Sequence, residues 1–171
     1  MTDLRSIPDD VKWKLSAQCA ARIPLLYEHV FRPVVGETYD GHEQQVFTEL
    51  ADLAFDIAAL LQLPMNNARE IAESLHIVNA ILFGPEYKEE IIEVGEDGAV
   101  IVHRRCPFLQ QTGGTGAGSD GMFQRCMAFT LTSQNRFNPK YESRFVRAMC
   151  AGDRQCEIKI QVRKEEKKSQ I

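Results

Sequence analysis

Cysteine is the residue type whose positions in this chain most suggest chemistry. Four of the five cysteines, Cys106, Cys126, Cys150 and Cys156, lie in one stretch, and the last two flank an Ala-Gly-Asp turn that would let their thiolates approach. Four reduced thiolates close in space suit a zinc ion or an iron–sulfur cluster. We therefore predict that these four share a metal site. Because the spacing lacks the paired Cys-x-x-Cys of a zinc ribbon, separately buried thiols are the alternative.

The surroundings of these cysteines carry a family resemblance. A Cys-Pro-Phe triplet at 106–108 follows a predicted strand, Cys126 lies in a predicted helix, and MCAGDRQCE spans 149–157. Together they resemble the aminothiazoline-carboxylate hydrolase-like proteins and the vinyl-reductase-like small-molecule-binding domains. The resemblance covers roughly residues 85–163, and it implies a fold with a ligand pocket better than it implies a reaction.

Two further residues are candidates for acid–base work. His103 precedes Cys106 by three residues, so it could join the thiolates or move a proton, although an ordinary strand histidine is the commoner case. Asp153 could act as a general base, or could hold its turn through side chain-to-backbone hydrogen bonds. The catalytic residues are otherwise unknown, and whether the chain is an enzyme stays open.

A glycine-rich loop at 112–121 is expected to be a mobile lid over a ligand pocket. It contains a literal G-x-G-x-x-G at 116–121, but no strand immediately precedes it and no parallel βαβ unit surrounds it, so a dinucleotide site is not expected. We predict Gly116, Gly118 and Phe123 as ligand-binding residues, with neighbouring phenylalanines as core or as a pocket wall.

Composition excludes some classes of protein. A net charge of −4 argues against nonspecific nucleic-acid binding. The first 20 residues lack the apolar core of a signal peptide, and no apolar run is long enough to span a bilayer. We therefore expect a cytoplasmic protein with reduced thiols and no membrane partner. Neither a nucleophile elbow with a Ser-His-Asp order nor a His-Glu-x-x-His motif is present.

The first half of the chain has the periodicity of helices. Helices are predicted from Pro8 to about 35, from 40 to 64 and from 67 to 84. Cys19 lies on an apolar stripe of the first helix and is expected in the core. The stripes of the other two helices should pack together, leave apolar surface over and form a homodimer; they are Val46, Leu50, Leu53, Ile57 and Leu60, and Ile71, Leu75 and Val78.

The second half changes to a period of two. Residues 89–94 and 99–104 alternate around a turn at 95–98, which predicts a hairpin. A helix over 122–134, a further helix after Asn138 holding Phe145, and a strand over 157–163 follow. The predicted class is α+β: a small antiparallel sheet packed by helices, with an N-terminal helical hairpin. Residues 1–84 form the helical part, 85–163 the α+β part and 164–171 a frayed tail.

The leading prediction of function is a cytoplasmic small-molecule-binding protein with a cysteine-ligated metal, zinc or an iron–sulfur cluster. The first alternative is a hydrolase of the aminothiazoline-carboxylate type, in which a thiolate or a metal-bound water attacks a C–N or C–S bond. The second is a helical interaction module with structural thiols. The predicted partners are a small-molecule ligand and a second copy of the chain.

Overall fold

Long helices dominate the first half of the chain. The computed structural model describes residues 3–85, 87–111 and 119–164. In chain order the first elements are the 3-10 helix η1 (Leu4–Ser6), α1 (Asp9–Val35), the 3-10 helix η2 (Gly36–Thr38), α2 (Tyr39–Leu60) and α3 (Ala68–Phe83). The predicted N-terminal helical hairpin is therefore present as α1 and α2, joined through η2.

A four-stranded antiparallel sheet forms in the second half. The elements are β1 (Glu89–Glu93), β2 (Gly98–His103), α4 (Pro107–Gln111), α5 (Ser119–Phe137), β3 (Tyr141–Arg147), the 3-10 helix η3 (Met149–Ala151) and β4 (Cys156–Val162). The strand order is β1-β2-β4-β3, with every neighbouring pair antiparallel. The predicted α+β class is confirmed.

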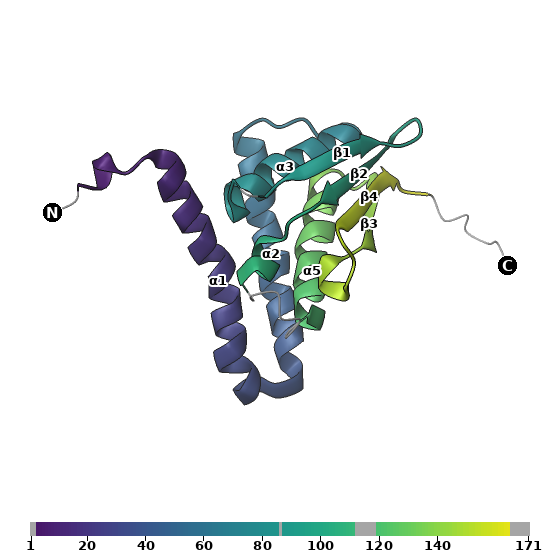
Figure 1. The fold of residues 1–171 in the computed structure, drawn as a ribbon. Helices are drawn as coiled ribbons and strands as arrows, with labels where there is room; N and C mark the ends of the chain where they lie inside the picture. The colour runs from purple at the N-terminus through teal and green to yellow at the C-terminus, as the bar shows by residue number, and fades with distance from the viewer. Residues whose placement is uncertain (1–2, 86, 112–118, 165–171) are drawn as a thin grey trace.

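Helices α3 and α5 cover one face of the sheet (Figure 1). α3 lies against β1 and β2, α5 lies against β3, and α2 packs along α5 on the side away from the strands. The core between these layers contains Ile71, Leu75 and Val78 of α3 and Ile101, Ile158 and Ile160 of the sheet, all at most 3 % exposed. The α3 stripe predicted from the sequence therefore packs inward.

Local signals account for several of these elements. Asn67 caps α3 by accepting a hydrogen bond from the backbone N–H of Glu70 at 2.9 Å, as its spacing predicts. The hairpin closes where Val94 N–H donates to Gly98 O at 2.8 Å. The helix predicted after Asn138 is wrong, because residues 141–147 form β3. Tyr141 and Phe145 alternate onto the face that α5 covers, which fits a strand and not a helix.

The burial of α1 differs from the prediction. Ala17 and Ala21 are the buried residues of this helix, and Cys19 is exposed. Small side chains let α1 approach the body of the protein closely, and this turns the larger apolar residues outward. The expected place of Cys19 in the core is therefore wrong. Pro24 and Pro33 lie inside the helix, which continues to Val35.

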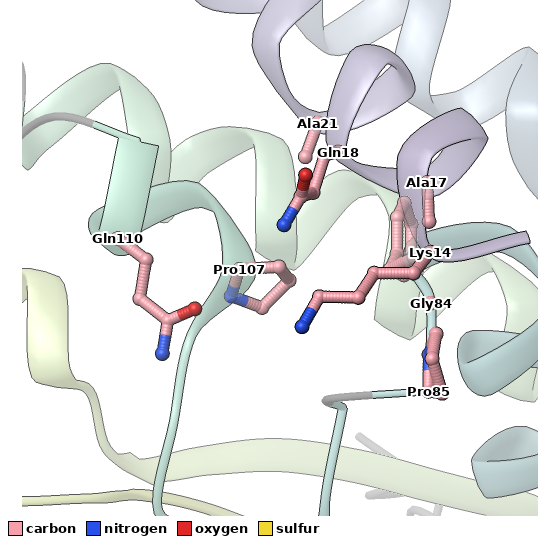
Figure 2. A pocket seen from close by; sticks show the side chains of 9 residues that line it. Lys14, Ala17, Gln18, Ala21, Gly84, Pro85, Pro107 and Gln110 are labelled. Atoms are coloured by element: carbon pink, nitrogen blue, oxygen red, sulfur yellow. The ribbon is translucent and has the colours of Figure 1, made fainter. Parts of the chain in front are cut away.

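Gly84 sets how closely α1 can approach the end of α3. It has a φ of +101°, and a Cβ atom built there would lie 2.6 Å from the Cβ of Ala17. Beside this contact is a hollow of about 40 Å³, into which Gln18 and Lys14 of α1 project opposite Pro107 and Gln110 of α4 (Figure 2). No side chain larger than hydrogen fits at Gly84 without displacing α1.

We expect Gly84→Ala to lower the free energy of unfolding by about 1–3 kcal/mol, because it adds backbone strain at positive φ to a steric clash with α1. Urea denaturation would measure this. Gly36→Ala is the matched control, since Gly36 also has a positive φ (+70°) but no atom within 4 Å of the added Cβ. Equal losses for the two variants would show that the contact between α1 and α3 contributes nothing.

Candidate functional site

The four cysteines predicted to act together line one pocket. Cys106 precedes α4, Cys126 lies on α5, Cys150 on η3 and Cys156 at the start of β4, and all four border a cavity of about 40 Å³. The remaining walls include His103 and Phe123, whose ring meets that of Phe145 edge-on at 5.4 Å. We call this cavity the thiol pocket.

The described residues of the thiol pocket form no metal-ligand group. Residues 3–85, 87–111 and 119–164 contain no group of three or more His, Cys, Asp or Glu arranged to hold a metal ion. Besides the effect of burial, the four thiols are close enough that they raise one another's pKa values. The predicted function as a protein with a cysteine-ligated metal is therefore wrong, because the described thiols border a shared space without forming a metal-ligand group.

Burial keeps these thiols protonated. It raises the pKa of Cys126 well above the usual value, raises those of Cys106 and Cys150, and raises that of Cys156 to about 11. The thiolate is the form that attacks electrophiles, so the resting pocket is apolar and weakly nucleophilic unless a base assists.

His103 of β2 lines the thiol pocket, and its imidazole contacts the carboxylate of Glu89 on β1. The Glu89 side chain is fully buried, and His103 Nδ1 lies 3.1 Å from its Oε1 and His76 Nδ1 3.2 Å from its Oε2. Asn79 Nδ2 donates to Oε1 at 3.2 Å. Burial alone would raise the pKa of Glu89, but the contacts with His103 and His76 outweigh it and lower the pKa to about 2.

The other predicted site residues have separate positions. Asp153 holds its turn, as one of the two interpretations expected: its Oδ2 accepts from the backbone N–H of Ala148 at 2.9 Å. Phe123 lines the thiol pocket. Gly116 and Gly118, and with them most of the predicted lid, lie outside the described residues.

A second hollow is larger and more apolar. It is a groove of about 620 Å³ between the second half of α1 and the first half of α2. Tyr27 and Phe31 form its α1 wall, and Val46 and Leu50 lie on its α2 wall. Figure 1 shows why it exists, since the two helices meet at η2 and diverge from there.

An apolar seam runs along the outward face of α1 beside this groove. Its residues recur at spacings of three and four, which places them on one face of a helix: Leu15, Cys19, Ile23, Leu26, Val30 and Val34. All are exposed, Val34 by 82 %. Val46, on the neighbouring helix, is 61 % exposed. We call the groove and the seam together the α1–α2 surface.

Buried charges tie the walls of the groove to α5. Arg125 of α5 is 3 % exposed; its Nη2 lies 2.6 Å from Glu28 Oε2 of α1 and its Nε 3.2 Å from Glu43 Oε2 of α2. Arg32 bridges Asp40 at 2.6 Å and Glu28 at 2.9 Å. These pairs fix α1 and α2 at the angle that keeps the groove open.

Sequence reasoning missed the roles of Glu89 and Arg125. Glu89 alternates with Ile91 onto the inner face of β1, so a charged residue in the core phase of a strand was the available signal. Arg125 gave no comparable signal, because its carboxylate partners are 82 or more positions away in the sequence.

Comparison with known proteins gives a fold and no family. No family model matches the chain, and no curated protein matches it. A solved structure with a similar fold is that of trafficking protein particle complex subunit 3 from Naegleria fowleri, covalently bound to palmitic acid. The identity is 12 % and the TM-score 0.54, over 91 % of this chain and 98 % of that chain. At this identity the likeness establishes the fold alone.

These findings overturn the predicted function. The prediction of a small-molecule-binding protein with a cysteine-ligated metal is wrong, because the described residues form no metal-ligand group and the fold is similar to that of a trafficking-complex subunit. The hydrolase alternative has no support from the comparisons. The structural role that the helical interaction module assigned to the thiols is not tested by these findings. The resemblance to the aminothiazoline-hydrolase-like and vinyl-reductase-like proteins stays a prediction, as does a zinc or iron–sulfur cofactor, which metal analysis would test.

Within the described helices, none has both the length and the apolar character to cross a bilayer.

Proposed function

We propose that this chain is a cytoplasmic subunit of a protein assembly of the vesicle-trafficking type, and that two copies associate through the α1–α2 surface. The observation that carries the proposal is the apolar seam with its adjoining groove. Monomeric proteins rarely expose apolar patches larger than a few hundred Å², and larger ones usually mark interaction sites. The fold shared with a trafficking-complex subunit supports the same class of function.

A second copy suits this surface because the surface carries both a ridge and a groove. In a two-fold dimer each patch meets its own copy, so the α1 seam of each protomer can enter the groove of the other. None of the six residues that define the seam is charged, and the exposed Arg22 lies on the same helix. Among the described residues, Glu43 is the one acidic side chain that lines the groove, and it is already paired with Arg125. Little charge would therefore lose its water on association.

We do not propose that this chain carries a covalent palmitate as the Naegleria protein does. The thiol pocket, at about 40 Å³, has room for only a few atoms. Among the described residues, the lining of the larger groove includes no cysteine that could carry an acyl group. The size of the thiol pocket and the lining of the groove therefore favour protein association at the groove over acylation.

Charged substitutions on the α1–α2 surface test the proposal. We expect Val30→Glu and Val46→Glu each to weaken self-association at least about 100-fold, because a two-fold interface buries each new charge twice. Sedimentation velocity would measure the dissociation constant. Val146→Glu is the matched control, since Val146 on β3 is 51 % exposed and lies far from both helices in sequence. An equal effect of all three variants, or none from Val30→Glu and Val46→Glu, would contradict the proposed interface.

A further inference from the structure

Three chemically active side chains lie in a row across the sheet. Glu89 on β1 pairs in register with His103 on β2, and His103 pairs with Cys156 on β4. Side chains directly opposite each other on neighbouring strands have their Cβ atoms about 4.5–5.5 Å apart and share a face. The row therefore places a carboxylate, an imidazole and a thiol side by side at the edge of the thiol pocket.

His103 is oriented with one nitrogen toward Glu89 and the other free for the pocket. The residue is 4 % exposed and lines the pocket. Its Nδ1 lies 3.1 Å from Glu89 Oε1 but outside hydrogen-bond geometry, and its Nε2 is buried, so neither nitrogen has a hydrogen-bond partner among the described residues. A carboxylate at this distance can hold the Nδ1 proton, which would leave the Nε2 lone pair as the base, as in a carboxylate–histidine–nucleophile triad.

Cys156 has a hydrogen-bond donor and a second thiol nearby. Its Sγ accepts from the backbone N–H of Met149 at 3.2 Å, and the next residue along the chain is Cys150. Both cysteines line the pocket, and after burial the nearby Cys150 is a further cause that raises the pKa of Cys156. A nucleophilic thiol beside a base, with another thiol adjacent, has the parts needed to form a sulfenic acid and then a disulfide.

We propose that Cys156 is a peroxide-reactive thiol that His103 deprotonates on attack, with Glu89 as the positioning residue and Cys150 as the resolving thiol. The oxidant is a small hydroperoxide such as hydrogen peroxide. A cavity of about 40 Å³ holds about three water-sized molecules, so it admits hydrogen peroxide and excludes bulky oxidants. This inference concerns the sheet side of the molecule and does not depend on the proposed function.

The two steps balance in atoms and electrons. Cys156 sulfur attacks one peroxide oxygen; an S–O bond forms, the O–O bond breaks, and His103 passes the thiol proton to the departing oxygen, which leaves as water. Cys150 sulfur then attacks the sulfenic sulfur; an S–S bond forms, the S–O bond breaks, and the hydroxyl leaves with the Cys150 proton as a second water. Two thiols lose two electrons, and hydrogen peroxide gains them.

Peptide mapping of the full chain tests this assignment. Trypsin cuts after Arg147, Arg154 and Lys159, so Cys150 falls in peptide 148–154 and Cys156 in peptide 155–159. After brief treatment with hydrogen peroxide and alkylation of the remaining thiols, we expect these two peptides joined by a disulfide that dithiothreitol reverses. In Cys150→Ser, Cys156 should instead be labelled by dimedone, a reagent for sulfenic acids. Cys19→Ser should react like the wild type.

The rates decide whether His103 and Glu89 act as proposed. We expect His103→Gln to slow oxidation of Cys156 at least 10-fold, and Glu89→Asp, which keeps the carboxylate, to retain more of the rate than Glu89→Gln of similar shape. Melting curves confirm that each variant is folded; if His103→Gln does not fold, the two Glu89 variants decide. Unchanged rates in the folded variants, a first disulfide through Cys106 or Cys126, or an unreacted Cys156 when exposed Cys19 is oxidised would each overturn the proposal.

Discussion

Replacing Arg125 with methionine is expected to lower the free energy of unfolding by about 3–5 kcal/mol, the largest effect of any single change considered. The substitution leaves the buried carboxylate of Glu43 without its ion-pair partner and leaves Glu28 with Arg32 as its remaining one, and an unpaired buried charge is strongly destabilising. For a chain of this size such a loss lowers the melting temperature by about 6–20 °C. Thermal unfolding followed by circular dichroism would measure it.

Arg136→Met is the control for Arg125→Met. Arg136 lies on the same helix and pairs with Asp52 at 2.9 Å, but both side chains are more than half exposed. An exposed pair contributes at most about 1 kcal/mol. If the two variants melted at the same temperature, the buried pairs of Arg125 would not be what fixes α1 and α2 on α5.

The second large effect is a dependence of stability on acid that comes from Glu89. Its pKa falls from an ordinary value of 4.5 to about 2 in the folded protein, which corresponds to about 3 kcal/mol of stability at neutral pH. A carboxyl group with a lowered pKa stabilises the fold above pH 4.5, and this contribution is lost as the pH falls from 4.5 to 2. Glu89→Gln should therefore be less stable than the wild type at pH 7 and approach it near pH 2.

His76 should add a smaller change in the opposite direction. The hydrogen bond with Glu89 raises its pKa, so its protonated form stabilises the fold below pH 6.5 and that stability is lost as the pH rises through the folded pKa. Urea denaturation of the wild type and Glu89→Gln between pH 2 and 8 would show both changes. A constant difference between the two proteins across that range would contradict the role assigned to Glu89.

Local patterns in the sequence were sufficient to predict the helical hairpin, the α3 cap and the β1–β2 hairpin. The turn at 95–98 also fixes the register that pairs Glu89 with His103, so that contact could have been inferred from the sequence. The pairing of His103 with Cys156 could not, because it requires β2 and β4 to meet across more than 50 residues. The sequence led us to expect that the four cysteines lie together, and they do line one pocket. The described residues form no metal-ligand group there.

The errors share a physical cause. Periodicity shows which residues lie on one face of an element, but it does not show what that face meets. The stripe through Cys19 is apolar and helical as predicted, yet α1 docks through Ala17 and Ala21, so the stripe faces outward. The strand over 141–147 was mistaken for a helix, since Asn138-Pro139 resembles a helix start and the alternation of Tyr141 and Phe145 is short.

The mass of the wild-type protein in solution tests the central claim most directly. Light scattering at tens of micromolar should give about twice the 19.4 kDa of one chain, because the α1–α2 surface of one copy covers that of another. Val30→Glu at the same concentration should give the mass of one chain. A wild-type mass of 19.4 kDa at high micromolar concentration, indistinguishable from that of Val30→Glu, would contradict self-association through this surface.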